Sequence, residues 1–180
     1  MPNLDDNLAL LARTPATLDA LLRDLPPAWT LANEGDRTWT PRDVVAHLAE
    51  LEHSDWMPRL HRLLEFGDTR PFDPIDREAF VRSAEGKTLP HLLDEFALLR
   101  HENLDTIRGL NLAPADLARK GMHPSLGPVT LAQLIASWAV HDMTHLHQIA
   151  RILAHQNREA VGPWSKFQGV LHCAGHSASA

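Results

Sequence analysis

Four long amphipathic patterns, separated by proline-rich segments, constrain the fold of this chain more than any other feature of its sequence. Leucine recurs at helical spacing, β-branched residues are sparse, and no run alternates apolar and polar side chains, which argues against a β-sheet. The patterns cover approximately residues 4–25, 40–66, 88–110 and 130–155. Helices of this kind bury their apolar faces in a four-helix bundle, so we predict an all-α fold.

The second and fourth patterns begin with recognisable capping residues. Thr40 is suited to cap a helix that has Pro41 at its first position, and Thr130 with Gln133 has the spacing of a capping box. Pro58 lies inside the second pattern, where the missing N–H of proline predicts a kink or a break. These signals support the predicted second and fourth helices.

Shorter elements are expected between and after the four helices. The sequence predicts short helices near residues 76–83 and 164–171, and a mostly irregular segment from 111 to 129 in which Pro114 opens one helical turn. Residues 1–173 are therefore expected to form one bundle domain with short extra helices in its loops. The small and polar residues 174–180 are expected to form a flexible C-terminal tail.

The 180 residues suit a single domain, and their charge balance narrows the range of partners. The 23 acidic residues outnumber the 17 Lys and Arg, and no basic run occurs, so we expect no nucleic-acid partner. No apolar stretch reaches the roughly 18 residues of a membrane span, and Asp5 and Asp6 stand where a signal peptide is basic. Cys173 is the only cysteine, which excludes an intrachain disulfide. A soluble, cytoplasmic protein is therefore expected, with no membrane partner.

The 12 histidines are the most unusual feature of the composition, and helical periodicity separates those that face inward. At about 100° per residue, His141 and His145 lie about 40° apart within the apolar stripe of the last helix, whereas His147 falls on the polar side. On the second helix, His47 shares the apolar stripe with Val44. Three imidazoles from two helices are thus expected to point into the bundle.

This set of imidazoles is suited to hold a metal ion. A His-x-x-x-His pair places two ligands one turn apart, and a third His on a facing helix leaves open positions for water or substrate. The alternative is a group of core histidines satisfied by hydrogen bonds, although burying adjacent imidazoles without a partner is costly. Because residue 142 is Asp, the sequence lacks the His-Glu-x-x-His pattern of zinc proteases.

A second group with the same spacing lies near the C-terminus. His172 and His176 flank Cys173, but the small residues around them do not favour a fixed site. No base or orienting partner marks Cys173 as a catalytic nucleophile. The role of this group stays open.

Three polar residues on or near the apolar stripes are candidates for supporting the histidines. Asp55, Asp142 and Gln148 could each accept the second ring N–H of a ligating His and so fix its tautomer. The alternative for each is a residue at the edge of a stripe that reaches water.

Candidate substrate-binding residues lie on the same helices. Arg100, beside the apolar stripe of the third helix, could bind an anionic group of a ligand, or it could form an interhelical salt bridge. Trp39 and Trp138 are expected in the core or in the wall of a pocket.

Three segments of the sequence resemble one known family. They are residues 39–52, Trp-Thr-Pro-Arg-Asp-Val-Val-Ala-His-Leu-Ala-Glu-Leu-Glu; residues 123–131, His-Pro-Ser-Leu-Gly-Pro-Val-Thr-Leu; and residues 141–149, His-Asp-Met-Thr-His-Leu-His-Gln-Ile. Together they resemble the DinB-like superfamily, which includes YfiT-type proteins regarded as metal-dependent hydrolases. The combination of an early His and a late His-x-x-x-His-x-x-Gln carries the resemblance, which extends over nearly the whole chain.

The resemblance implies a fold, a cofactor and an assembly. The fold is a four-helix bundle with up-down-down-up connections, and members are often homodimers. The cofactor is a divalent metal, commonly zinc or nickel, held by residues that correspond here to His47, His141 and His145. Some members are transferases or isomerases that use the thiols bacillithiol or mycothiol. The name of the family implies no DNA-binding chemistry.

Three functions remain open from the sequence. The first is a metal-dependent hydrolase or a transferase that uses a low-molecular-weight thiol, in either case acting on a small molecule. The second is a non-catalytic metal-dependent sensor or ligand-binding bundle. The third is a structural bundle whose histidines hold no metal.

Overall fold

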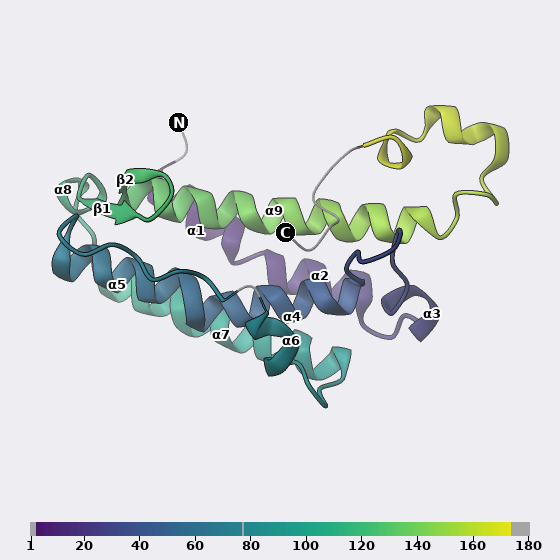
Figure 1. Cartoon of the computed structure of the whole chain (residues 1–180), viewed down its shortest axis with the longest axis horizontal. Coiled ribbons are helices and arrows are strands. Elements are labelled where there is room, and N and C mark those ends of the chain that lie inside the picture. Colours follow the sequence, from purple (N-terminus) through teal and green to yellow (C-terminus); the bar gives the residue numbers. More distant parts are fainter. Residues whose placement is uncertain (1–2, 77, 174–180) are drawn as a thin grey trace.

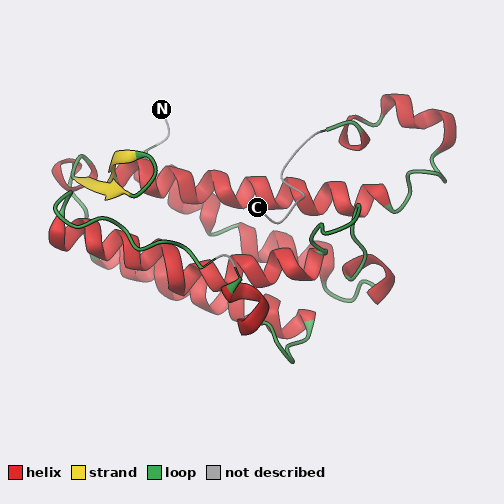
Figure 2. Ribbon diagram, in the orientation of Figure 1, coloured by secondary structure: helices red, strands yellow, loops and turns green. Residues whose placement is uncertain are grey.

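The computed structural model describes residues 3–76 and 78–173, and its long helices form a four-helix bundle (Figures 1 and 2). The four members run in the directions up, down, down and up along the chain (Figure 1), as the resemblance implies. The first member is α1 (Leu4–Leu11) with α2 (Thr14–Leu22), the second is α4 (Pro41–Leu51) with the π-helical turn η1 (Glu52–Trp56) and α5 (Met57–Phe66), the third is α7 (Leu89–Gly109), and the fourth is α9 (Leu131–His155).

Short elements fill the connections (Figure 2); the sequence predicts those near residues 79–83, 114–117 and 162–171, but not the helical turn at 27–30. They are α3 (Pro27–Thr30), α6 (Ala79–Ser83), α8 (Pro114–Leu117), β1 (Lys120–His123), β2 (Gly127–Thr130), and the 3₁₀ helices η2 (Gly162–Phe167) and η3 (Gly169–Leu171). The predicted caps are present: Thr40 forms a capping box with Asp43, and Thr130 forms one with Gln133. These caps fix the starts of α4 and α9, the two helices that carry the three inward histidines.

The first bundle member is broken, so the prediction of one helix over residues 4–25 is wrong. Pro15 lacks an N–H and its ring clashes with the carbonyl of Leu11, four residues earlier, so α1 ends at Leu11. The freed carbonyl of Leu11 accepts a hydrogen bond from Nη1 of Arg100 at 2.8 Å. The break thus supplies a buried acceptor to the middle of the bundle.

A two-stranded antiparallel hairpin corrects the expectation of irregular structure without a sheet between residues 111 and 129. Lys120 pairs with Thr130, and His123 pairs with Gly127. The hairpin packs closely on α5, since a Cβ at Gly121 would lie 3.0 Å from Leu63 Cδ1. Tertiary contact rather than strand propensity therefore holds this hairpin.

The core consists of two apolar clusters with a polar layer between them. One cluster lies toward α5 and the hairpin, and the other toward α3 and α6. Between them, three charged side chains are buried on three different bundle members: Glu52, Arg100 and Asp142, each 1% exposed or less. His145 also lies at this level, buried on α9.

The C-terminal residues leave α9 and form the two 3₁₀ helices (Figure 1). His172 Nε2 contacts the Ser165 carbonyl oxygen at 2.8 Å, and Cys173 is exposed. His176 and the predicted tail over residues 174–180 lie outside the described residues. Within the part of the chain that the structure describes, none of the helices has the length and apolarity to cross a membrane.

Candidate metal centre

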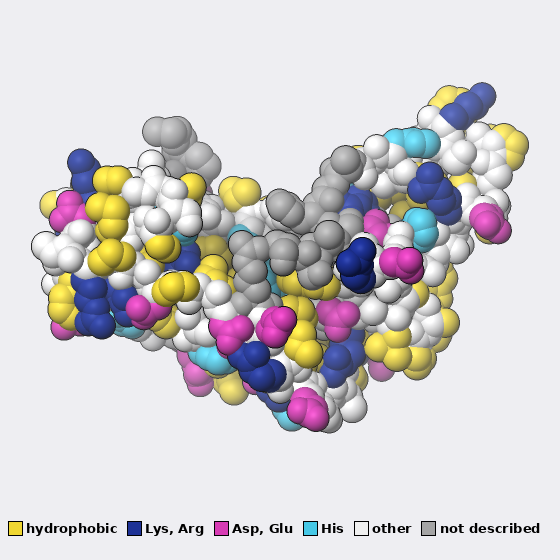
Figure 3. All heavy atoms as spheres, in the orientation of Figure 1, with side chains coloured by type: hydrophobic (Ala, Val, Ile, Leu, Met, Phe, Trp, Pro, Cys, Tyr) yellow, Lys and Arg dark blue, Asp and Glu magenta, His cyan; other side chains and the backbone are white. Residues whose placement is uncertain are grey.

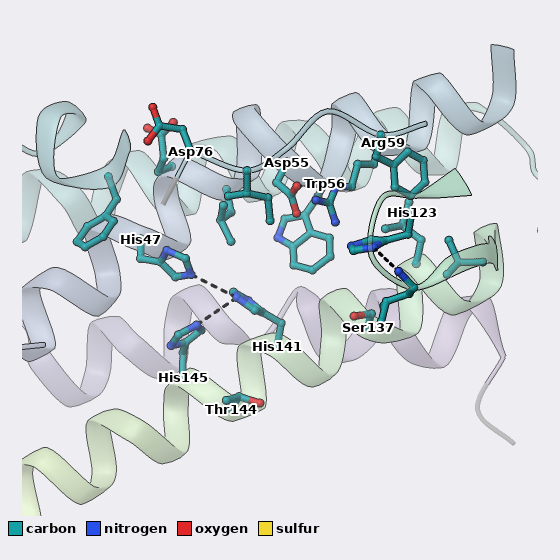
Figure 4. Close-up of a pocket in the computed structure, with 18 of the residues that line it drawn as sticks. His47, Asp55, Trp56, Arg59, Asp76, His123, Ser137, His141, Thr144 and His145 are labelled. Carbon is teal, nitrogen blue, oxygen red and sulfur yellow. Dashed lines mark hydrogen bonds and ion pairs between the residues drawn. The ribbon is translucent and has the colours of Figure 1, made fainter. Parts of the chain in front are cut away.

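Three imidazoles from α4 and α9 meet in the middle of the bundle (Figure 4). His141 Nε2 lies 3.3 Å from His47 Nε2 and 3.1 Å from His145 Nε2. Three nitrogens bound tetrahedrally at about 2.0–2.1 Å from zinc are separated by about 3.3 Å, so the spacing suits one metal ion. The three residues that periodicity turned inward are thus brought together, and their donor set fits a divalent metal.

Neighbouring side chains orient the three rings. Nδ1–H of His145 donates a hydrogen bond to the amide oxygen of Gln148 at 2.8 Å, which places the lone pair of the ring on Nε2. Trp39 stacks on His145 with 6.0 Å between ring centroids and tilts against His47 at 4.8 Å. Trp56 packs edge-on against His141 at 5.2 Å. These contacts hold the ligand atoms in their converging positions.

Burial keeps the imidazoles of His47 and His141 in the neutral form that a metal ligand requires. Desolvation, with a smaller contribution from the charge of His145, lowers the pKa of His47 to about 3. Desolvation also lowers the pKa of His141, to about 2. The charges of His145, His47 and Arg100 make smaller contributions in the same direction. Both imidazoles are therefore neutral at physiological pH.

A pocket of about 1200 Å³ opens beside the three histidines and extends toward the hairpin. His47, His141 and His145 line one end of the pocket, and Arg59 and His123 line the other (Figure 4). Trp39, which packs against His47 and His145, lies at the histidine end. Apolar side chains, including Trp56, Leu51 and Leu134, form much of the wall between the two ends. The pocket is therefore elongated, with polar groups at both ends.

Arg100 lies in the polar layer of the core, not beside the histidines. Its guanidinium donates to Glu52 Oε1 from Nη2 at 2.7 Å, to Asp142 Oδ2 from Nη1 at 2.6 Å, and to the carbonyl of Leu11. Burial opposes its positive charge, but the two carboxylates outweigh burial and raise its pKa. The salt bridge that the sequence left open is formed here, and it occupies the donors offered for an anionic substrate.

Two more predicted residues belong to the same layer. Asp142 is fully buried and bonds to Arg100 rather than to a histidine. Trp138 is 1% exposed, stacks on Trp56 at 5.5 Å, and donates its Nε1–H to Glu52. Neither residue lines the pocket. Glu52, which the sequence reasoning missed, accepts from Trp138 and shares Arg100 with Asp142.

Asp55 and Arg59 lie in the pocket wall, where Asp55 Oδ1 is 2.7 Å from Arg59 Nε. Burial raises the pKa of Asp55 more than the charge of Arg59 lowers it. Sequence reasoning named Asp55 but missed Arg59, because the π-helical turn η1 shifts the faces of the residues that follow it. Pro58, which removes a helical N–H and clashes with the carbonyl of Ser54, is the available signal for that shift.

Comparisons with known proteins agree with this fold. The sequence profile of the DinB superfamily matches residues 10–149. The structure is similar to YfiT from Bacillus subtilis, described as "a probable metal-dependent hydrolase with an unusual four-helix bundle topology", at 21% identity and a TM-score of 0.67 over 87% of each chain. It is also similar to TT2238, described as a four-helix bundle protein, at 26% identity and a TM-score of 0.53 over 80% of this chain and 95% of that chain. A search of curated proteins found no match.

Proposed function

This chain belongs to the DinB superfamily, and we propose that it is a metal-dependent enzyme that hydrolyses a small molecule. The observation that carries the proposal is the convergence of three histidine Nε2 atoms in the wall of a large pocket. Three imidazoles suit zinc, and nickel accepts the same ligands. When bound, such a metal supplies Lewis acidity that activates a water or thiol nucleophile near neutral pH.

The chain's own residues orient and shield this site. Gln148 holds the His145 tautomer, and Trp39 covers His145 and His47 on one side. Trp56 and Leu51 give the pocket apolar walls next to the histidines, which limit the water around a bound substrate. All three histidines line the pocket, so a ligand that enters it reaches their donor atoms.

Transfer of a low-molecular-weight thiol is the second candidate reaction, and the size of the pocket favours it. About 1200 Å³ exceeds the roughly 300–1000 Å³ typical of a site for one small ligand. The pocket therefore has room for a thiol and an electrophile together. Assays should accordingly be run with and without an added thiol.

Elemental analysis of tag-free protein tests the metal centre directly. We expect about one zinc or nickel per chain in the wild type and a loss of most of it in His145→Ala, which removes one of three ligands. His147→Ala is the matched control, because His147 is exposed on the same helix and is not part of the cluster.

Two results would contradict the proposal. One is an absence of bound metal in the wild type even after zinc or nickel is supplied and the excess is removed. The other is metal-loaded protein that turns over no ester, amide or thiol-acceptor substrate but changes shape or oligomeric state when the metal is removed. That second result would favour a metal-dependent sensor.

A further inference from the structure

The distal end of the pocket carries an arginine whose hydrogen-bonding capacity is only partly used. Arg59 lines the pocket with its side chain 11% exposed, and among the described residues its ion pair is with Asp55, through Nε. That Nε is buried without a directed hydrogen bond. Within the described part of the chain, Nη1 and Nη2 donate to no side chain or carbonyl. A guanidinium has five N–H donors, so the outer edge of this one is available to a ligand.

The surroundings of Arg59 fix its position. The guanidinium carbon lies 5.4 Å from the centre of the Phe72 ring, and Asp55 is one helical turn earlier on the same bundle member. Figure 4 shows the side chain pointing between Trp56 and His123 into the space that faces α9. The available edge therefore faces the pocket.

Two further donors lie at the same end of the pocket. His123 Nδ1 accepts hydrogen bonds from the backbone N–H groups of Ser125 and Leu126, at 3.1 and 3.2 Å, so its proton is on Nε2. Ser137, on α9 one turn before His141, also lines the pocket, and its hydroxyl can donate (Figure 4). A guanidinium edge, an imidazole N–H and a hydroxyl thus share one end of the pocket.

The charge of this subsite favours a single negative charge on the ligand. Asp55 already offsets part of the charge of Arg59, and a dianion would also lie close to that carboxylate. A planar carboxylate matches the two parallel N–H groups of a guanidinium edge. A phosphate dianion is the less favourable occupant.

We propose that Arg59, with His123 and Ser137, binds the carboxylate of a substrate whose reacting end lies at the three histidines. This assignment rests on the function proposed above. Between His47 and Asp55, whose carboxylate contacts the Arg59 guanidinium, the helix axis advances about 12 Å, at ~1.5 Å per residue. The substrate class is thus an elongated monocarboxylate whose apolar middle lies along Trp56 and Leu134.

Binding of paired probes to metal-free protein tests the subsite independently of the metal. Phenylbutanoate and phenylbutanol have the same apolar body and differ in charge, and isothermal titration gives both dissociation constants. We expect the acid to bind at least ~10-fold more tightly than the alcohol in the wild type, as a charge-assisted hydrogen bond allows. We expect the ratio to fall close to one in Arg59→Met.

Arg70→Met is the matched control, because Arg70 is exposed and lies over Phe66 rather than in the pocket. It should keep the wild-type ratio. Arg59→Lys retains the charge without the planar edge and should lower the ratio several-fold, which covers the case in which Arg59→Met does not fold. Equal binding of acid and alcohol by the wild type, or a preference that survives in both Arg59 variants, overturns the proposal. Tighter binding of the phosphonate with the same body overturns the choice of a monoanion.

A second arm separates this proposal from the proposed function. In cobalt-loaded protein, mercaptohexanoate and mercaptohexanol report ligation through cobalt–thiolate absorption, and we expect the acid to bind more tightly only where Arg59 is present. If the protein takes up no cobalt but the binding of phenylbutanoate still depends on Arg59, the proposed function fails and the carboxylate subsite stands. If both thiols give the absorption with equal affinity in the wild type, the metal centre stands and the subsite fails.

Discussion

Arg100 and Arg59 both lie beside buried carboxylates, yet their surroundings differ in a way that separates structure from binding. Arg100 is 1% exposed in the layer between the two apolar clusters, and its guanidinium donates to Glu52, Asp142 and a backbone carbonyl. Arg59 contacts one carboxylate and presents its outer edge to a pocket. A saturated guanidinium holds helices together, whereas a partly used one can bind a ligand.

The two carboxylates that contact these arginines lie in the same π-helical turn, η1. Glu52, at the start of η1, faces the core and accepts from Arg100 and Trp138, while Asp55 in the same turn faces the pocket. Trp56 joins the two regions, because it stacks on Trp138 and also contacts His141. The π-helical turn therefore connects the buried ion network to the pocket that contains the candidate metal centre.

Replacing Arg100 should have the largest effect on stability. Arg100→Met keeps the length of the side chain but leaves Glu52 and Asp142 buried without a cation, which should lower the free energy of unfolding by about 3–5 kcal/mol. Urea denaturation of metal-free protein measures the loss. Arg59→Met should cost less, about 1–3 kcal/mol, because burial raises the pKa of Asp55 and its carboxyl can take up a proton when the guanidinium is absent. Equal losses of unfolding free energy in Arg100→Met and Arg59→Met would contradict the distinction between a structural and a ligand-binding arginine.

Replacing one carboxylate of the network should have a smaller effect. Asp142→Asn keeps the shape of the side chain and leaves Arg100 paired with Glu52, so we expect a loss of about 2 kcal/mol, the value of a hydrogen bond to a charged group. The same denaturation experiment measures it. Because the change lies behind the histidines, the metal content should stay near that of the wild type. A variant that keeps its stability but loses its metal would instead link Asp142 to the histidines.

Periodicity predicted the parts of this molecule in which one helical face is apolar. The stripe on α9 determines that His141 and His145 face inward while His147 is exposed, and the stripe on α4 does the same for His47. Capping at Thr40 and Thr130 marked the starts of both helices. The bundle members, apart from the break in the first one, and the meeting of the three imidazoles could therefore be predicted without any tertiary information.

The sequence did not show which arginine would face the pocket. Arg100 lies beside an apolar stripe and looked available, but its partners Glu52 and Asp142 come from two other bundle members. Arg59 follows a π-helical turn, and a regular period of 3.6 residues cannot be carried through such a turn. The hairpin that brings His123 to the pocket is held by contacts with Phe72 and Leu63. These features depend on packing between segments far apart in sequence.

Replacing the pocket carboxylate, Asp55, should have the smallest effect, and the pH dependence of that effect reports how strongly Arg59 is engaged. Burial raises the pKa of Asp55 despite the nearby Arg59. As the pH rises from about 4, the unfolded chain therefore releases this proton before the folded chain does, and folding loses free energy until the folded pKa is passed. The difference in unfolding free energy between the wild type and Asp55→Asn should thus shift in favour of the variant between pH 4 and pH 7.

Asp73 provides a control of the opposite sign. It is exposed, and its hydrogen bond with Arg62 lowers the pKa of its carboxyl, so its contribution to stability is present above a pH of about 4 and is lost as the pH falls below that value. Relative to Asp73→Asn, the wild type should therefore gain stability as the pH rises over the acidic range. Urea denaturation at a series of pH values, with metal removed, measures both differences. If the difference in unfolding free energy changed with pH in the same direction for Asp55 as for Asp73, Arg59 would stabilise the Asp55 carboxylate fully. Its guanidinium would then be engaged as completely as that of Arg100, and its outer edge would be a poor site for a ligand.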